Sequence, residues 1–323
     1  MPITQTSTES QVVVAAPLRR GEPWAAGAVL GYASAEILDR VAMRHADPLV
    51  GPFLRGLPSL ALGIILVWKN HTLHQVRPRS ASYIGRRPIL SLLTAGVLST
   101  LGLFAYYFAM RVGGVVITVP VLQTYVIWGT LIAWVFLGER LASLAVLGIG
   151  LLCAGLGFLT WGQFSGQPTS AHWILAIPLA LFTALTYGVS GVLWRDAQLR
   201  GAHQSTAILL QFLASEGVAL LGLMAMGRSG TILDTAAQNL AALLASGVLS
   251  GVIAIYCLFT AFRLMTVARV FAFFPLNPIL ATIFAHFVLH EYLSLTMLTG
   301  VVLVSAGLTL TQVFSSKEEK QAA

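Results

Sequence analysis

The chain has 323 residues, of which 57% are hydrophobic and only 10% are charged. A soluble domain carries about 25% charged residues, so this composition excludes a water-soluble globule. The net charge of +7 does not indicate a nucleic-acid binder, because the basic residues lie in short segments between long apolar stretches.

Ten apolar stretches follow one another along the chain, and each is long enough for a helix that crosses a bilayer. None shows the two-residue alternation that a membrane β-barrel needs. We therefore predict an all-α integral membrane protein with ten transmembrane helices. They are expected near residues 24–45, 48–68, 88–110, 114–137, 141–161, 172–195, 204–226, 239–262, 268–289 and 293–314.

The two ends of the chain are polar, and residues 1–22 and 315–323 are expected to be disordered tails. If both tails are cytoplasmic, 14 lysine and arginine residues fall on the cytoplasmic side and three, Arg44, Arg111 and Arg228, on the other. The positive-inside rule therefore predicts cytoplasmic termini. The first apolar run lacks a cleavage site and continues as a helix, so no cleavable signal is expected.

The second half of the chain repeats the first. A shift of 152 residues places the segment 137–156 on the segment 289–308 with several identities, including Glu139 on Glu291. Each repeat, 24–161 and 172–314, contains five predicted helices, so the second copy must enter the membrane from the opposite side. Inverted repeats are typical of secondary transporters, whose substrate site lies near the midplane between the halves.

The helix junctions carry a recognisable motif. The segments 136–141 (FLGERL) and 289–293 (LHEYL) resemble the LGE-x-L motif that ends each half of proteins in the EamA family. Arg55, in Phe-Leu-Arg, resembles the second-helix arginine of that family, and Pro278 lies where its ninth helix carries proline.

This resemblance covers residues 24–314, and Val126 and His290 depart from the family pattern. It implies membership of the drug/metabolite transporter superfamily, whose members carry small metabolites across the bacterial inner membrane. The expected location is therefore the inner (plasma) membrane, with many membrane passes.

Ionisable side chains inside an apolar span cost about 2.5 to 3.5 kcal/mol each, so each needs a reason. Helix 24–45 carries Glu36, Asp39 and Arg40. With a rise of about 1.5 Å per residue, Glu36 and Arg55 reach the same depth. We hypothesise an ion pair between them that faces a cavity. An i, i+4 pair of Glu36 with Arg40 is an equal alternative.

Two further features suggest a site. Glu216 lies near the middle of its span. It is interpreted either as a proton-coupling carboxylate or as a protonated carboxyl that is hydrogen-bonded to a neighbouring helix. The segment 275–278 (PLNP) is expected to interrupt the ninth helix. This interruption is either a broken helix beside a cavity or a kink that serves packing. The equivalent part of the fourth helix contains polar and aromatic residues, which suit a small amphipathic organic molecule. The predicted substrate-binding residues are Tyr32, Glu36, Arg55, Gln123, Tyr125, Trp128, Tyr187 and Asn277, with Glu216 as the coupling candidate.

Other residues have structural interpretations. Glu139 and Glu291 each open a helix, where a carboxylate favours the positive end of the dipole. His71 and His74 lie in an arginine-rich loop that repels cations, and both cysteines lie inside spans. We expect no metal, no cofactor and no disulfide.

The sequence favours a secondary active transporter of a small organic metabolite, an amino acid or similar solute, that works by alternating access as an exporter. The alternative is a lipid-handling or other intramembrane enzyme-like protein, but no catalytic signature supports an enzyme. A channel would need a ring of polar residues repeated in several helices. The expected partners are the substrate and the lipid bilayer, and the sequence leaves a monomer or a homodimer, and proton coupling, open.

Overall fold

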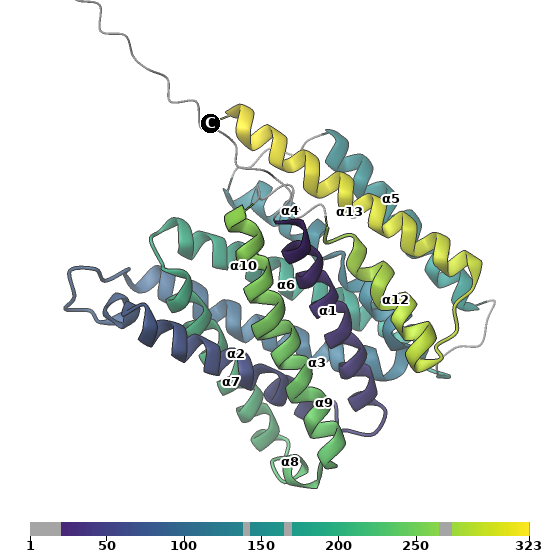
Figure 1. Cartoon of the computed structure of the whole chain (residues 1–323), viewed down its shortest axis with the longest axis horizontal. Coiled ribbons are helices and arrows are strands. Elements are labelled where there is room, and N and C mark those ends of the chain that lie inside the picture. The colour runs from purple at the N-terminus through teal and green to yellow at the C-terminus, as the bar shows by residue number, and fades with distance from the viewer. Residues whose placement is uncertain (1–20, 138–142, 165–169, 265–272, 323) are drawn as a thin grey trace, which may run out of the picture.

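The computed structural model describes residues 21–137, 143–164, 170–264 and 273–322. Within these ranges every regular element is a helix (Figure 1). The longer helices are α1 (Glu22–Met43), α2 (Val50–Lys69), α3 (Arg86–Leu122), α4 (Tyr125–Leu137), α5 (Ser143–Phe164), α6 (Ala176–Leu199), α7 (Gln204–Ala225), α9 (Ala237–Val248), α10 (Ile255–Leu264), α12 (Leu276–Leu289) and α13 (Leu295–Ala322). The short elements are η2 (Thr72–Val76), η3 (Trp173–Leu175), α8 (Thr231–Asp234) and the π-helix η4 (Leu249–Ala254), which joins α9 to α10.

Five described helical segments are long and apolar enough to cross a membrane, and three shorter helices are also apolar. The five are Val50–Lys69, Arg86–Gly129, Trp173–Leu199, Gln204–Ala225 and Ala237–Leu258, and the three are Val146–Gly162, Leu276–Leu289 and Leu295–Leu310. The all-helical architecture predicted from hydropathy is therefore confirmed. The count of ten spans stays a prediction.

α3 is two helices joined at a sharp break. Gly114 has φ +72° and ψ −173°, a backbone conformation that residues with a Cβ atom rarely adopt. The predicted boundary between two spans lies at residues 111–113, next to this break. The second half of α3 then ends at Leu122, and Gln123 and Thr124 form a turn before α4.

The two proline- and amide-containing segments lie at matching places. α4 begins at Tyr125 directly after the Gln123–Thr124 turn, and α12 begins at Leu276 directly after Pro275. Their starts are 151 residues apart, one residue less than the shift of 152 that relates the two halves of the sequence. Asn277, in the first turn of α12, is therefore placed where an interrupted helix leaves backbone and amide groups available.

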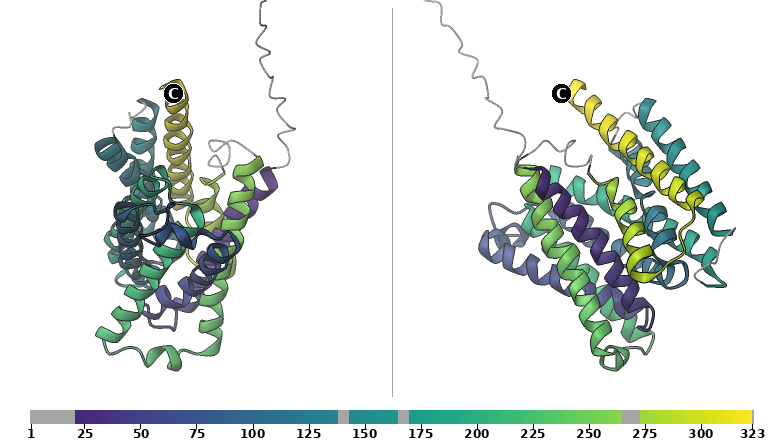
Figure 2. Two further views of the ribbon diagram at one scale, coloured as in Figure 1. Left: turned by 90° about the vertical axis from the view of Figure 1, so that its left-hand side faces the viewer. Right: turned by 45° about the vertical axis from the view of Figure 1, so that its right-hand side comes forward.

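The packing partners of the helices follow the same repeat. α1 packs on α9, η4, α10 and α12, whereas α6, its counterpart in the second half, packs on α3 and α4. α2 packs on α7 and α9, and α7 packs on α2 and α3. α5 and α13 lie side by side, as Figures 1 and 2 show. Each half is therefore stabilised by the other, and the core between them is built from both.

Glycines allow the closest of these contacts. A Cβ atom on Gly155 would lie 2.6 Å from the carbonyl oxygen of Gly300, and one on Gly300 would lie 2.7 Å from that of Gly155. A Cβ on Gly247 would collide with the carbonyl of Arg55, and one on Gly251 with Ser59. The small residues therefore bring the backbones of α5 and α13, and of α9 and α2, into close contact, and let η4 approach the Ser59 side chain of α2.

Candidate functional site

Asp39 of α1 is fully buried and is the centre of a polar cluster. Arg55 of α2 lies 2.9 Å from Asp39 Oδ2, and the hydroxyls of Tyr106 and Tyr107 of α3 donate to the two carboxylate oxygens at 3.2 and 2.9 Å. The Arg55 guanidinium also lies 5.7 Å from the centre of the Tyr106 ring, and its Nε donates to Ser250 Oγ at 3.4 Å. The charge of Asp39 is therefore compensated by residues from two other helices.

Arg40, the next residue, forms a second buried ion pair. Its Nε donates to Glu291 Oε1 at 2.8 Å, and its Nη1 donates to the carbonyls of Met110 and Arg111 at 2.6 and 3.0 Å. Glu291 Oε2 accepts from the backbone amides of Val115 and Val116 at 2.9 and 3.2 Å. We call Arg40, Glu291 and these four backbone groups the Arg40–Glu291 clamp.

The clamp closes around the break in α3. Arg40 binds the carbonyls of Met110 and Arg111 just before the break, and Glu291 binds the amides of Val115 and Val116 just after it, so the clamp supplies partners on both sides of the interruption. A Cβ atom on Gly114 would lie 2.6 Å from Glu291 Oε2 and would also collide with Oε1. Gly114 is therefore required both by its positive φ and by the approach of the carboxylate.

The segment around Glu291 is itself held in place. Arg44 donates to the carbonyl of Leu289 at 2.8 Å, His290 ends α12 in a left-handed conformation, and the His286 ring lies 3.0 Å from the carbonyl of Glu291. The sequence predicts that Glu291 favours the start of the helix that follows it. The structure instead directs its carboxylate to the start of a helix in the other half. Glu139 lies outside the described residues.

Glu36 and Asn277 meet between α1 and α12. Asn277 Nδ2 donates to Glu36 Oε1 at 3.0 Å, and the two residues are only 7% and 6% exposed. Glu36 Oε2 and Asn277 Oδ1 have no hydrogen-bond partner within the described part of the chain. Two buried oxygen atoms therefore require hydrogen-bond donors, and a buried unsatisfied acceptor is costly.

Aromatic residues lie near this carboxyl–amide pair in the chain. Tyr32, one turn before Glu36, packs against Phe274, which lies in the turn before Asn277, with ring centres 6.1 Å apart. Tyr125 of α4 lies within electrostatic range of both Tyr32 and Glu36. The site therefore has an apolar aromatic part next to an acceptor part.

The other predicted site residues are placed as follows. Tyr187 of α6 lies within electrostatic range of Arg55 and Asp39. Gln123 is buried where α3 ends, and the Cβ of Trp128 approaches Gly188 of α6. The side chains of Gln123 and Trp128 form no hydrogen bond with the described residues, so the structure does not join them to the Glu36–Asn277 pair.

Both hypotheses for the partner of Glu36 are wrong. Arg55 pairs with Asp39, Arg40 pairs with Glu291, and Glu36 binds the amide of Asn277. Glu36 and Asp39 are three residues apart, so both are at the depth of Arg55 but only one faces it. The sequence did not pair these arginines with their partners Asp39, Tyr106, Tyr107 and Glu291. A signal for the two carboxylates was present, because the first two spans carry one arginine each and an arginine that is buried within a span needs a carboxylate.

Glu216 of α7 is 5% exposed, and neither carboxyl oxygen has a hydrogen-bond partner among the described residues. Its carboxyl fills the space above Gly56 of α2, where an added Cβ would collide with it. Gly56 follows Arg55 in the chain. Glu216 is therefore a buried carboxyl next to the helix that carries Arg55, and among the described residues it lacks the hydrogen bond to a neighbouring helix that one of the two hypotheses required. The proton-coupling hypothesis stays a prediction.

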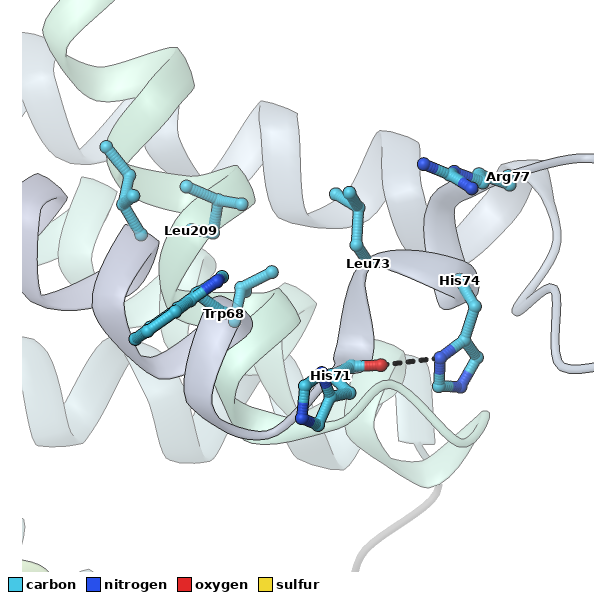
Figure 3. Close-up of a pocket in the computed structure, with 8 residues that line it drawn as sticks. Trp68, His71, Leu73, His74, Arg77 and Leu209 are labelled. Atoms are coloured by element: carbon cyan, nitrogen blue, oxygen red, sulfur yellow. Dashed lines mark hydrogen bonds between the residues drawn. The ribbon is translucent and has the colours of Figure 1, made fainter.

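A pocket lies away from these groups, at the end of α2. It is lined by Ile64, Val67, Trp68, His71, Leu73, His74, Arg77 and Leu209 (Figure 3). His71 and His74 are joined by a bond from the His74 ring to the carbonyl of His71 at 2.6 Å. In the described ranges no group of three His, Cys, Asp or Glu residues could hold a metal ion.

Three comparisons with known proteins bear on this arrangement. Curated proteins give no match. A solved structure titled "Crystal structure of protein" superimposes with a TM-score of 0.61 at 16% identity, over 93% of this chain and 98% of that one, so the fold is shared. The sequence model of the EamA-like transporter family matches residues 19–161 and 174–313, one match for each half. With both halves matched and the fold shared, the chain belongs to the EamA-like transporter family.

Proposed function

We propose that this protein is a secondary active transporter that carries a small amphipathic organic metabolite, an amino acid or a similar solute, across the inner membrane by alternating access. In this proposal the repeats 24–161 and 172–314 form two inverted five-helix halves, with ten spans and cytoplasmic termini. Export is the proposed direction. The family consists of transporters and not of enzymes, which supports this class of function.

The packing between the halves supports alternating access. α1 and α6 have corresponding partners in the opposite halves, so the two halves can exchange roles on the two sides of a central site. The Arg40–Glu291 clamp lies where α1 and α12 end and ties α1 to α3 and to the residue after α12. We infer that this clamp closes the site on the side where α1 ends, and that it must release when that side opens.

The single observation that carries the proposal is that the carboxyl of Glu36 has no cationic partner among the described residues of the site. Arg40 and Arg55 already face Glu291 and Asp39, whereas Glu36 faces only an amide. Together Glu36 Oε2 and Asn277 Oδ1 offer acceptors and no donor. A substrate ammonium group supplies the missing donors and charge, and the rings of Tyr32 and Phe274 suit its apolar part.

A binding screen tests this proposal with matched probes. Purified protein in detergent is heated with amphipathic amino acids, each in three forms: the free amino acid, its amide, and its N-acetyl derivative. A bound ligand raises the melting temperature by mass action. We expect stabilisation by the free amino acid and by the amide, which keep the ammonium group, and none by the N-acetyl form. Proteoliposomes then test whether the stabilising probe is transported.

The substitution Glu36→Gln is expected to weaken binding of the stabilising probe about 10- to 100-fold, because a charged hydrogen bond contributes about 1.5 to 3 kcal/mol. Glutamine keeps the size of the side chain, so the melting temperature of the free protein should change little. Equal binding of the N-acetyl form, or full binding by the variant, would refute the role of Glu36. If none of the probes bound the unaltered protein, the proposed substrate class itself would be wrong.

Glu216 is the proposed proton-coupling group. A buried carboxyl without a partner is costly when charged, so it can bind and release a proton as its surroundings open and close. We expect Glu216→Gln to retain exchange of substrate between the two sides of proteoliposomes but to lose accumulation driven by a pH gradient. If accumulation persists, Glu216 serves only the packing of α7 on Gly56.

A further inference from the structure

The pocket at the end of α2 combines an apolar side with a basic side. Its volume is about 460 Å³. In Figure 3, Trp68 and Leu209 lie on one side, and His71, His74 and Arg77 lie along the other. Ile64 and Trp68 are 54% and 79% exposed, which places large apolar surfaces at the outside of the helical bundle.

The pocket is preformed, because hydrogen bonds fix η2 against the start of α7. Asn70 Nδ2 donates to Ser205 Oγ at 2.7 Å. Gln75 donates to the carbonyl of Gly201 at 3.1 Å and accepts from the amide of His203 at 3.0 Å. Gly63 lets α2 approach the backbone of Leu209 closely. Ligand binding therefore does not have to order these elements.

The charge around the pocket is one-sided. Residues 48–138 contain no Asp or Glu, whereas the segment 69–87 carries Lys69, Arg77, Arg79, Arg86 and Arg87. The neighbouring acid of α6, Asp196, lies 3.8 Å from Arg87 and binds Arg200, which is four residues along the same helix. The Arg77 guanidinium has no ion pair or hydrogen bond within the described ranges. The basic side of the pocket therefore lacks an internal counter-charge.

We propose that this pocket binds an anionic phospholipid, with the phosphate held by Arg77 and His74 and an acyl chain lying on Ile64, Trp68 and Leu209. α2 is a membrane-spanning candidate and ends here, so the pocket lies at the depth of lipid headgroups. Basic pockets between helices at a membrane surface bind such headgroups. A free phosphate or glycerol phosphate would leave the apolar side uncovered, which favours the lipid over a soluble anion.

Native mass spectrometry of the full chain tests the proposal. The protein is purified in detergent and mixed with phosphatidylglycerol or with phosphatidylcholine of the same chain length, and bound lipids are counted by mass. We expect at least one phosphatidylglycerol to stay bound under conditions that remove phosphatidylcholine. Glycerol phosphate, offered as a soluble competitor, should not displace it.

The substitution Arg77→Gln is expected to reduce retention of phosphatidylglycerol about fivefold, the effect of one basic residue at a membrane surface. Arg79→Gln is the matched control, since it removes the same charge from the same exposed segment but does not line the pocket. Equal losses of phosphatidylglycerol retention in the two variants would show that the lipid is held by the overall positive charge of the segment and not by this pocket. Equal retention of the two lipids, or displacement by glycerol phosphate, would also overturn the proposal.

Discussion

Replacement of Arg40 by alanine is expected to lower the free energy of unfolding by about 3 to 5 kcal/mol, because it leaves a buried charge without its partner. Glu291 would keep its bonds to the amides of Val115 and Val116 but lose its cation. The carbonyls of Met110 and Arg111 would lose a donor at the same time. Before the break, α3 would then keep the bond from Ser170 to the carbonyl of Val112 but lose both bonds from Arg40.

Unfolding by denaturant in detergent measures this effect, with the loss of helical signal as the readout. Arg44→Ala is the matched control, because Arg44 is one turn further along the chain, is exposed, and makes a single bond to the carbonyl of Leu289. We expect it to cost about 1 kcal/mol or less. Arg40→Lys should not restore stability, since an ammonium cannot reproduce the planar fork that reaches a carboxylate and two carbonyls. Equal costs for Arg40→Ala and Arg44→Ala would contradict the clamp.

The clamp also shows what the sequence could and could not predict. The helices follow from hydropathy, because apolar stretches of about 20 residues have few alternatives in a membrane. The break near residues 111–114 follows from Arg111, Gly113 and Gly114 in an otherwise apolar stretch. In contrast, Arg40 and Glu291 are separated by 251 residues, and only the packing of α1 between parts of the second half brings them together.

The error over Glu36 has a similar physical origin. The rise per residue of a helix predicts how deep each residue lies in the membrane. By depth alone, Glu36 and Asp39 are equivalent candidates for the ion-pair partner of Arg55. The choice depends on the rotation of α1 about its axis, which its contacts with α9, α10 and α12 determine. Asn277 was predicted from the interrupted helix, but its pairing with Glu36 needs the same rotation.

Glu216 illustrates how context changes an interpretation. The sequence places it near the middle of a span but does not show what it faces. The structure packs α7 against α2 and α3, so this carboxyl lies inside the bundle, over Gly56. The absence of a side chain at Gly56 makes room for the carboxyl of Glu216. Neither residue alone indicates in the sequence that the other is its neighbour.

Replacement of Asp39 by alanine is expected to be as damaging as loss of Arg40, about 3 to 5 kcal/mol, because Arg55 would keep its charge in a mostly buried place. The hydroxyls of Tyr106 and Tyr107 would also lose their acceptor. Tyr107→Phe removes only one of these bonds, and a bond to a charged group contributes about 1.5 to 3 kcal/mol. In denaturant unfolding, the Tyr107→Phe variant should therefore have a clearly higher free energy of unfolding than the Asp39→Ala variant.

A double variant separates the structural role of this ion pair from a role in transport. Asp39→Leu with Arg55→Met replaces both charges by apolar side chains, which is often neutral or stabilising relative to the broken pair. We expect it to be more stable than Asp39→Ala. The Arg55 side chain is 18% exposed whereas that of Asp39 is fully buried, so a substrate can contact Arg55 but not Asp39. The stable double variant should then bind the ammonium probe but transport it more slowly. Transport at the rate of the unaltered protein would restrict Arg55 to balancing the charge of Asp39.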